Sequence, residues 1–402
     1  MEILASTLNK KEKVQTTFFT KCLSLYFMLM LCNIFNIAGM GTLLRFYAIG
    51  IIVVALFYLP KASILLDKTF ILQIAYLFIC LCSVLYSIHF QTSLSVFITL
   101  VLNFGLIILC QSIKFSSHEV EALQKSLVWG GVFVLLASLF FADFSEGNRL
   151  TILIAGESAD QNYINGYLLF AFSYFAYNAI NCSNQKTLNL GVIFLIFLFT
   201  FATGSRGALL SLFSILSILL LIKVKDRKKD IIKVLLFIVA ALAGFNLILS
   251  ILPEEVAMRF SLDYIEETGT SSRTEIWKAL LTRFFNDNIG SILFGKGLYT
   301  SSFYNTYDSH VAHNAFIEVL IGTGFVGLTI YCLLIFSFLR KAWKLGNYIL
   351  FVALCGFMIM SLSLSLIEYK PIFNAFIIIE IAYRTNRTTK KQIEPNNPKG
   401  GI

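Results

Sequence analysis

Apolar runs of about 20 residues recur along the chain, and they constrain its fold more than any other feature. Each is long enough for a helix to cross a bilayer. Only 14% of the 402 residues are charged, whereas a soluble domain carries about 25%, and the mean hydropathy is +0.78. The number of runs excludes a single-span anchor. Their length excludes an outer-membrane barrel, whose strands are short and alternating. The sequence therefore predicts an all-α, polytopic bundle of transmembrane helices.

These runs predict about twelve membrane-spanning helices. They cover residues 18–37, 43–59, 70–88, 94–112, 127–142, 163–181, 188–204, 207–222, 232–252, 314–338, 347–366 and 371–383. The expected organisation is a cytoplasmic segment at 1–17, nine spans within 18–252, a long outer loop at 253–313, three spans within 314–383 and a disordered cytoplasmic tail at 384–402.

Lysine and arginine fix the expected orientation, because cytoplasmic loops are enriched in both. With an even number of spans, both termini share one face, and 23 of the 32 basic residues fall on that face. We therefore place both termini in the cytoplasm. The net charge of +9 is explained by this distribution, so it does not indicate binding to nucleic acid.

The long outer loop at 253–313 is rich in aromatic residues, Trp277 among them, so its composition does not predict disorder. Loops of this length without secondary structure are uncommon in compact proteins and tend to be functional. Within it, SRTEIWKALLTRFF (272–285) places apolar Ile276, Leu280 and Phe284 at helical spacing. We expect an amphipathic helix that lies on the membrane surface.

An arginine set among small residues interrupts the apolar pattern in TGSRGALLSL (203–212). A charged side chain at bilayer depth costs roughly 3 kcal/mol or more, so such residues face a partner or a cavity. Gly204 and Gly207 permit the backbone of a tight turn. We therefore predict a helical hairpin with Arg206 at the outer surface. An arginine that extends to lipid phosphate explains the residue equally well in isolation.

Arg273 and His313 also fall on the outer face, and each has a structural explanation as well as a functional one. Arg273 begins the amphipathic helix, where a solvated charge is common. His313 precedes Asn314 at the start of a span, where this pair can cap the helix. Two histidines, His310 and His313, without a third ligand do not indicate a metal site. We expect neither a metal nor a cofactor.

Taken in order, these motifs resemble the O-antigen ligase and polymerase superfamily. The resemblance rests on TGSRGALLSL, the SSRTEIW helix start, LFGKGL and HNAFIEVLIGTGFVGL, preceded by Asp160-Gln161-Asn162. It covers about residues 155–335 by motif. It implies a metal-independent glycosyltransferase of the bacterial inner membrane, which takes a glycan from an undecaprenyl-pyrophosphate carrier. A ligase gives the glycan to lipid A-core, whereas a polymerase gives it to the next carrier-linked repeat.

The resemblance assigns catalysis to three residues: Arg206 in the hairpin, Arg273 in the loop and His313 at re-entry. The expected substrate contacts are Arg206, Arg273, Asn314, Asp160, Asn162, Trp277 and Glu318. Asp160, Glu275 and Glu318 are reserve candidates for the base. We expect an O-antigen ligase, with a polymerase that uses the same donor as the alternative.

A transporter of lipid-linked oligosaccharides is the alternative from another functional class. A transporter carries polar or charged residues along a path through its spans. The predicted spans hold almost none beyond Asn33, Asn36 and Asn103, and the charges gather on one face. The sequence therefore favours the transferase.

Overall fold

The computed structural model describes residues 16–30, 40–58, 66–143, 150–154, 157–181, 185–226, 250, 257–258, 273–307 and 309–393. The predicted span at 232–252, apart from Ser250, lies outside the described residues. The same holds for residues 259–272 of the long loop and for the last residues of the tail, 394–402.

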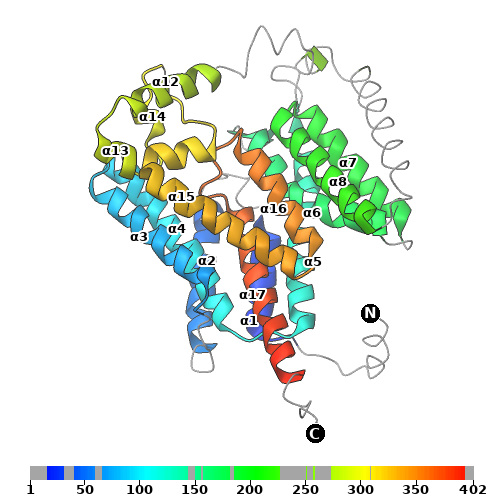
Figure 1. Ribbon diagram of the computed structural model, residues 1–402. Coiled ribbons are helices and arrows are strands. Elements are labelled where there is room, and N and C mark those ends of the chain that lie inside the picture. The colour runs from blue at the N-terminus through cyan, green and yellow to red at the C-terminus, as the bar shows by residue number, and fades with distance from the viewer. Residues whose placement is uncertain are drawn as a thin grey trace.

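Helices make up nearly all of the described chain (Figure 1). They are α1 (Phe18–Met28), α2 (Met40–Tyr58), α3 (Lys68–Leu85), α4 (Phe90–Ser112), α5 (Ser117–Phe140), α6 (Gln161–Asn181), α7 (Lys186–Ala202), α8 (Arg206–Asp226), α12 (Arg273–Phe285), α13 (Ile289–Phe294), α14 (Ser301–Tyr304), α15 (Ala315–Lys344), α16 (Tyr348–Ser361) and α17 (Lys370–Ile393). Within the described residues, five segments are long and apolar enough to cross a membrane: α3, α4, α5, the part of α8 over Arg206–Lys223, and α15. This fits an all-α membrane protein, and the count of about twelve spans stays a prediction.

A small antiparallel sheet departs from the expected all-α fold. It has the order β1-β2-β3 and joins Ala142–Asp143, Thr151–Ile154 and Glu157–Ala159 between α5 and α6. The central strand, TILI, is rich in β-branched residues, which favour strands. It is too short for its alternation to be recognised against the neighbouring apolar runs.

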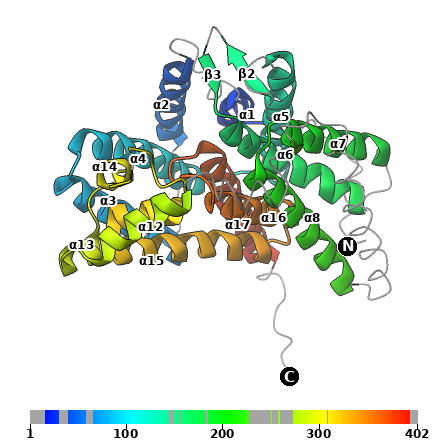
Figure 2. The ribbon, with the colours of Figure 1, turned by 90° about the horizontal axis from the view of Figure 1, so that it is seen from above.

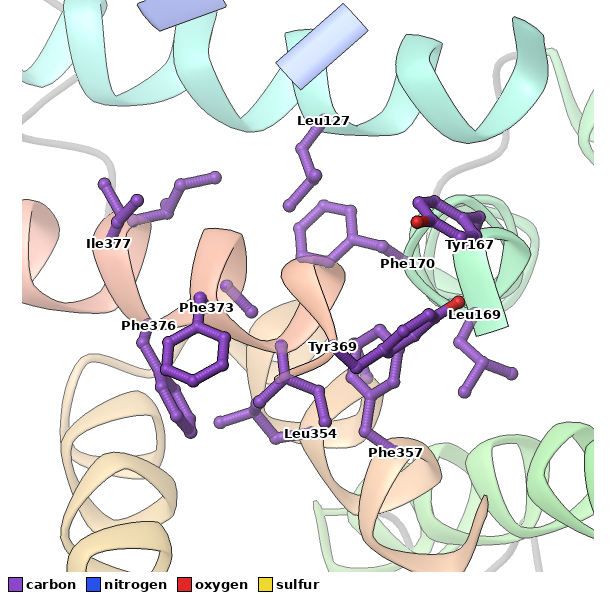
Figure 3. Close-up of a cluster of buried hydrophobic side chains, with 14 of the residues drawn as sticks. Leu127, Tyr167, Leu169, Phe170, Leu354, Phe357, Tyr369, Phe373, Phe376 and Ile377 are labelled. Atoms are coloured by element: carbon purple, nitrogen blue, oxygen red, sulfur yellow. The ribbon is translucent and has the colours of Figure 1, made fainter. Parts of the chain in front are cut away.

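The core lies where α5, α6, α16 and α17 meet (Figure 3). In Figure 3, Leu127 of α5 and Phe170 of α6 lie above Phe373 of α17, and Phe357 of α16 lies below and to the right of them. All four side chains are buried. Because lipid tails are as apolar as these side chains, close packing rather than the hydrophobic effect holds such helices together.

One buried ion network lies at the predicted cytoplasmic end of the bundle. Lys341 on α15 contacts Glu380 on α17 at 2.6 Å and Asp67, the N-cap of α3, at 2.7 Å. Glu380 is 1% exposed. The expectation of spans almost free of charge therefore missed Glu380. Its partner explains why it is tolerated, since a charge within the membrane is paired.

The helix α15 is kinked at Gly324, where φ is 67°. The LFGKGL segment fills this kink: the backbone N–H groups of Lys296 and Gly297 donate to the carbonyls of Ile321 and Gly322 at 2.8 and 3.0 Å. A kink releases backbone groups that need new partners at membrane depth. The turn at 295–298 thus provides these partners.

The helix α12 confirms the amphipathic helix predicted at 272–285, but its surroundings differ from those expected. Its apolar residues Ile276, Leu280 and Phe284 pack against Leu320 and Ile321 of α15. Figures 1 and 2 show α12 above α15, at the end of the bundle opposite the C-terminal part of α17. Protein rather than lipid therefore covers the apolar face of α12, and its position at the membrane surface stays a prediction.

The last helix continues beyond its predicted end at residue 383, since α17 extends to Ile393. The Arg384 guanidinium donates to the carbonyl of Gln111, and the Thr385 hydroxyl donates to the carbonyl of Phe115 at 3.2 Å. These bonds attach the helix to the α4–α5 connection. The first part of the expected disordered tail is therefore helical.

Candidate functional site

The segment around Arg206 forms the predicted hairpin. The helix α7 ends at Ala202 and α8 begins at Arg206, so the two are joined by three residues, 203–205. Gly204 has φ of 65°, a conformation that glycine adopts without strain. Arg206 is half-buried at the N-terminus of α8, where the backbone N–H groups and the helix dipole add positive potential. The hairpin therefore presents a cationic end suited to an anion.

The Asp160-Gln161-Asn162 element and the next turn of α6 pack against this turn. The Ser205 hydroxyl donates to Oδ1 of Asn162 at 2.9 Å. One turn further along α6, the Asn165 amide donates to the Thr203 hydroxyl at 2.9 Å. Asp160 is exposed, and one of its carboxylate oxygens accepts from the backbone N–H of Asn162 at 2.8 Å. Two regions about forty residues apart are thus joined by side-chain hydrogen bonds.

A short linker between α16 and α17, residues 362–369, joins the hairpin to the re-entry segment. Gly207 approaches it so closely that a Cβ atom there would collide with Oγ of Ser363. From the other side, the Asn314 amide donates to the carbonyl of Leu362 at 3.1 Å. The Tyr369 hydroxyl donates to the carbonyl of Tyr163, beside Asn162, at 2.5 Å. The linker therefore gathers three predicted elements at one end of the bundle.

His313 is held in a strained backbone conformation between two fixed neighbours. Its φ is 47°, in the left-handed region that few residues other than glycine adopt, although asparagine, aspartate and histidine do so more often than the rest. Asn314 caps α15, since its Oδ1 accepts from the N–H groups of Phe316 and Ile317 at 2.9 and 3.1 Å. The side-chain amide of Asn314 therefore has structural partners on both atoms: its oxygen caps α15, and its nitrogen bonds the carbonyl of Leu362. Such strain persists only where the surroundings impose it, and it clusters at functional sites.

Glu318 anchors this segment from within the protein. Its side chain is 0% exposed. Oε2 accepts from the Ser301 hydroxyl at 2.5 Å and from the Ala312 N–H at 3.4 Å, while Oε1 accepts from the Ser301 N–H at 3.2 Å. The carboxylate thus fixes the residue before His313. Its direct contact with substrate stays a prediction.

Arg273 is the first residue of α12 and is half-buried. The two serines that precede it, Ser271 and Ser272, lie outside the described residues. One turn along, the Trp277 indole donates to the carbonyl of Ala312 at 2.7 Å. The helix that carries Arg273 is therefore attached to the residue next to His313. Glu275, a reserve candidate for the base, is exposed on the same helix.

An ion pair stiffens the segment that follows α12. Asp287 contacts Lys296 at 2.8 Å and accepts from the Tyr304 hydroxyl at 2.7 Å. Burial raises the pKa of the Asp287 carboxyl, but the bonds from Lys296 and Tyr304 outweigh burial and hold it well below its usual range. The guanidinium of Arg283 lies 4.3 Å from the Tyr304 ring centroid. These contacts give α12 a rigid base.

One part of this region was missed by sequence reasoning. A cavity with a volume of about 630 Å³ lies beside the linker. Of its lining, Tyr163 and Tyr299 adjoin motifs, whereas Arg45 and Glu368 follow no recognisable pattern. Among the described residues, no group of three or more His, Cys, Asp or Glu side chains is placed to hold a metal ion.

Comparison with known proteins identifies one family. The family model described as O-antigen ligase matches residues 191–332, a region that contains Arg206, Arg273, His313 and Glu318. No curated protein matches the chain. The match supports glycan transfer of the O-antigen ligase type by a bacterial inner-membrane protein. It confirms, over residues 191–332, the resemblance to the O-antigen ligase and polymerase superfamily.

Proposed function

We propose that this protein transfers a glycan from an undecaprenyl-pyrophosphate carrier to an acceptor sugar hydroxyl, as an O-antigen ligase with lipid A-core as acceptor. The observation that carries the proposal is the contact of the hairpin and the re-entry segment with one linker. Gly207, next to Arg206, meets Ser363, and Asn314, next to His313, bonds Leu362. Residues that the chain separates by more than a hundred positions thus share one end of the bundle.

The two arginines suit a pyrophosphate leaving group. When the acceptor oxygen attacks C1 of the donor sugar, the bond from C1 to the carrier pyrophosphate breaks, and its electron pair remains on pyrophosphate. Guanidinium groups are always charged and bind phosphate oxygens in pairs. Held near the membrane, such preorganised charge stabilises the developing anion. Arg206 and Arg273 take this role, helped by the N-terminus of α8.

His313 serves the acceptor in this mechanism. The acceptor hydroxyl loses its proton as the new glycosidic bond forms, and the imidazole receives it, since histidine titrates near neutral pH. No acid is required on the other side, because pyrophosphate leaves as an anion. Glu318 and Asn314 hold the His313 backbone in place from both sides.

The chemistry requires the outer face to hold the site. Thr282 on α12 is exposed, so a cysteine introduced there (Thr282→Cys) should react with an impermeant thiol reagent in intact cells. Lys344→Cys, exposed at the other end of α15, should react only after the cells are opened. The unmodified chain gives the background from its native cysteines. Labelling of residue 344 in intact cells would show that the predicted orientation is wrong. The proposed site would then lie on the opposite face of the membrane from the donor.

Transfer by the purified protein tests the proposal directly. The full chain in lipid nanodiscs, given carrier-linked glycan and lipid A-core, should form the ligated product. We expect the rate to be unchanged in excess EDTA, because the arginines provide the charge that a metal would otherwise provide. Loss of activity in EDTA with recovery on adding a divalent cation would contradict the mechanism. Elongation of carrier-linked glycan without transfer to lipid A-core would indicate a polymerase.

A further inference from the structure

A groove between α5, α6 and α7 lies at the predicted cytoplasmic end of the bundle, away from the proposed reaction site. It has a volume of about 540 Å³. Figures 1 and 2 show these three helices together on one side of the molecule, with α7 at the edge of the described bundle. The lining includes Lys125, Asn178 and Gln185, which lie close to the predicted cytoplasmic ends of three spans. The groove is therefore expected to open where the inner leaflet meets the cytoplasm.

The polarity of the lining changes in one direction along the groove. On α5, Val132 is followed towards the cytoplasm by Trp129 and then by Lys125, each about one helical turn further. On α7, Val192 is followed in the same direction by Asn189. An apolar inner part thus passes through an aromatic and amide level to a charged mouth. A phospholipid has the same order, from its acyl chains through the ester linkages to the phosphate.

Asn189 indicates a hydrogen-bonding ligand at the middle level of the groove. It is 5% exposed, and its side-chain amide has no hydrogen-bond partner among the described residues. The amides of Gln73 and Gln111 also lack partners there, but they are fully enclosed, whereas that of Asn189 keeps accessible surface in the groove that it lines. Buried polar groups are normally hydrogen-bonded. An ester carbonyl of a lipid would accept from Nδ2 of Asn189.

The mouth of the groove carries both signs of charge. The Lys125 ammonium contacts the Glu121 carboxylate at 2.6 Å, and both side chains are more than half exposed. Glu121 lies one turn further towards the cytoplasm, about 6 Å along the helix, and one headgroup layer of a bilayer is about 5–8 Å thick. In phosphatidylethanolamine, a primary ammonium lies outside the phosphate, which matches this order of charges. An anionic headgroup would place like charge beside Glu121.

Exposed apolar side chains on the walls favour a lipid over a soluble ligand. Trp129 is 50% exposed and Leu188 is 59% exposed, and both line the groove. Tryptophan is enriched at the interface between membrane and water, where its ring lies at the level of the headgroups. A water-soluble molecule would leave this apolar surface uncovered, whereas a phospholipid covers it with an acyl chain.

We propose that this groove binds a phospholipid of the inner leaflet whose headgroup carries a primary ammonium. The phosphate accepts from Lys125, the ammonium donates to Glu121, and an ester carbonyl accepts from Nδ2 of Asn189. An acyl chain lies against Val132 and Val192. The inference does not depend on the proposed glycan transfer, because these residues all lie at the other end of the bundle from Arg206, Arg273 and His313.

Native mass spectrometry of the full chain in detergent, freed of lipid, tests the headgroup. The probes are phosphatidylethanolamine, phosphatidylcholine and phosphatidylglycerol with the same acyl chains. The choline lipid keeps the phosphate, but its ammonium has no N–H group to donate. We expect the ethanolamine lipid to bind about fivefold to tenfold more tightly than the choline lipid, the effect of one hydrogen bond. Glu121→Ala removes the acceptor at an exposed position and should abolish this preference.

Asn189→Leu tests the groove itself. It removes the amide and keeps a side chain of similar size, so the ethanolamine lipid should bind about fivefold to tenfold more weakly. Because the Asn189 amide has no partner among the described residues, the thermal unfolding midpoint without lipid should stay the same or rise. The matched control is Asn181→Leu, which makes the same change at an exposed position near the cytoplasmic end of α6. It should bind lipid as the unmodified chain does.

Two results would overturn the inference, whether or not the protein transfers a glycan. If Asn189→Leu and Glu121→Ala bind all three lipids as the unmodified chain does, the groove is not a lipid site. If Asn189→Leu weakens binding of phosphatidylglycerol more than that of the ethanolamine lipid, the bound headgroup is anionic, and the role assigned to Glu121 is wrong. Arg206→Lys should keep the lipid preference of the unmodified chain, because it changes only the opposite end of the bundle.

Discussion

Replacing Arg206 with lysine should reduce glycan transfer by about a hundredfold to a thousandfold, the usual effect of removing one preorganised donor to a developing anion. Lysine keeps the positive charge but loses the planar fork that binds two phosphate oxygens together. Because Arg206 is half-buried at the start of α8, its side chain is held in place, and the loss of the fork lowers the rate more than it would at an exposed position. The measurement is the transfer rate of the purified variant with carrier-linked donor. Arg273→Lys should behave in the same way.

The control for this result is Arg340→Lys, at the opposite end of the bundle and exposed on α15. It makes the same chemical change away from the donor, and its activity should equal that of the unmodified chain. Thermal unfolding of each variant checks that the fold is intact. Full activity of Arg206→Lys would mean that the hairpin is an ordinary turn at the membrane surface. The proposal that Arg206 binds pyrophosphate would then be wrong.

The positions of the site elements followed from the sequence because each marks the end of a helix. The hairpin prediction is confirmed by the turn between Ala202 and Arg206. The amphipathic helix is confirmed over Arg273–Phe285. Apolar periodicity and helix-end signals identify such boundaries, since the residues concerned are neighbours in the chain.

The partners of these elements did not follow from the sequence. The apolar stripe of α12 suits a membrane surface or a protein surface equally, and only the fold shows that Leu320 and Ile321 cover it. The linker at 362–369 was hidden because its apolar residues extend the hydropathy of the neighbouring spans. The predicted spans ended at 366 and resumed at 371, whereas α16 ends at Ser361 and α17 begins at Lys370.

The kink in α15 shows a further limit of sequence reasoning. Gly324 is one of several glycines in the re-entry motif, and glycine alone does not specify a break. The break depends on the backbone bonds from Lys296 and Gly297, which lie in another part of the chain. These bonds seat α13 and α14 against α15, and the carboxylate of Glu318 then reaches Ser301. The geometry around His313 thus depends on contacts between segments that no local pattern encodes.

Replacing His313 with alanine should remove transfer while leaving donor binding almost unchanged. A general base contributes about a hundredfold to ten-thousandfold in rate, and the transfer rate should fall by that factor. Binding of carrier-linked donor depends on the arginines, so its Kd should stay close to that of the unmodified chain. Because alanine is less favoured than histidine at the φ of 47° found here, the thermal unfolding midpoint of the variant must be measured beside its activity.

Two further variants decide what the histidine contributes. His313→Gln keeps hydrogen-bonding groups but cannot take up a proton at neutral pH. If it is as inactive as His313→Ala, the imidazole acts as the base. If it recovers most of the activity, the histidine orients the acceptor hydroxyl instead. Loss of donor binding in His313→Ala, to the extent found for Arg206→Lys, would make His313 a pyrophosphate ligand. The base would then have to be one of the carboxylates, with Asp160 the exposed candidate and Glu318 the buried one.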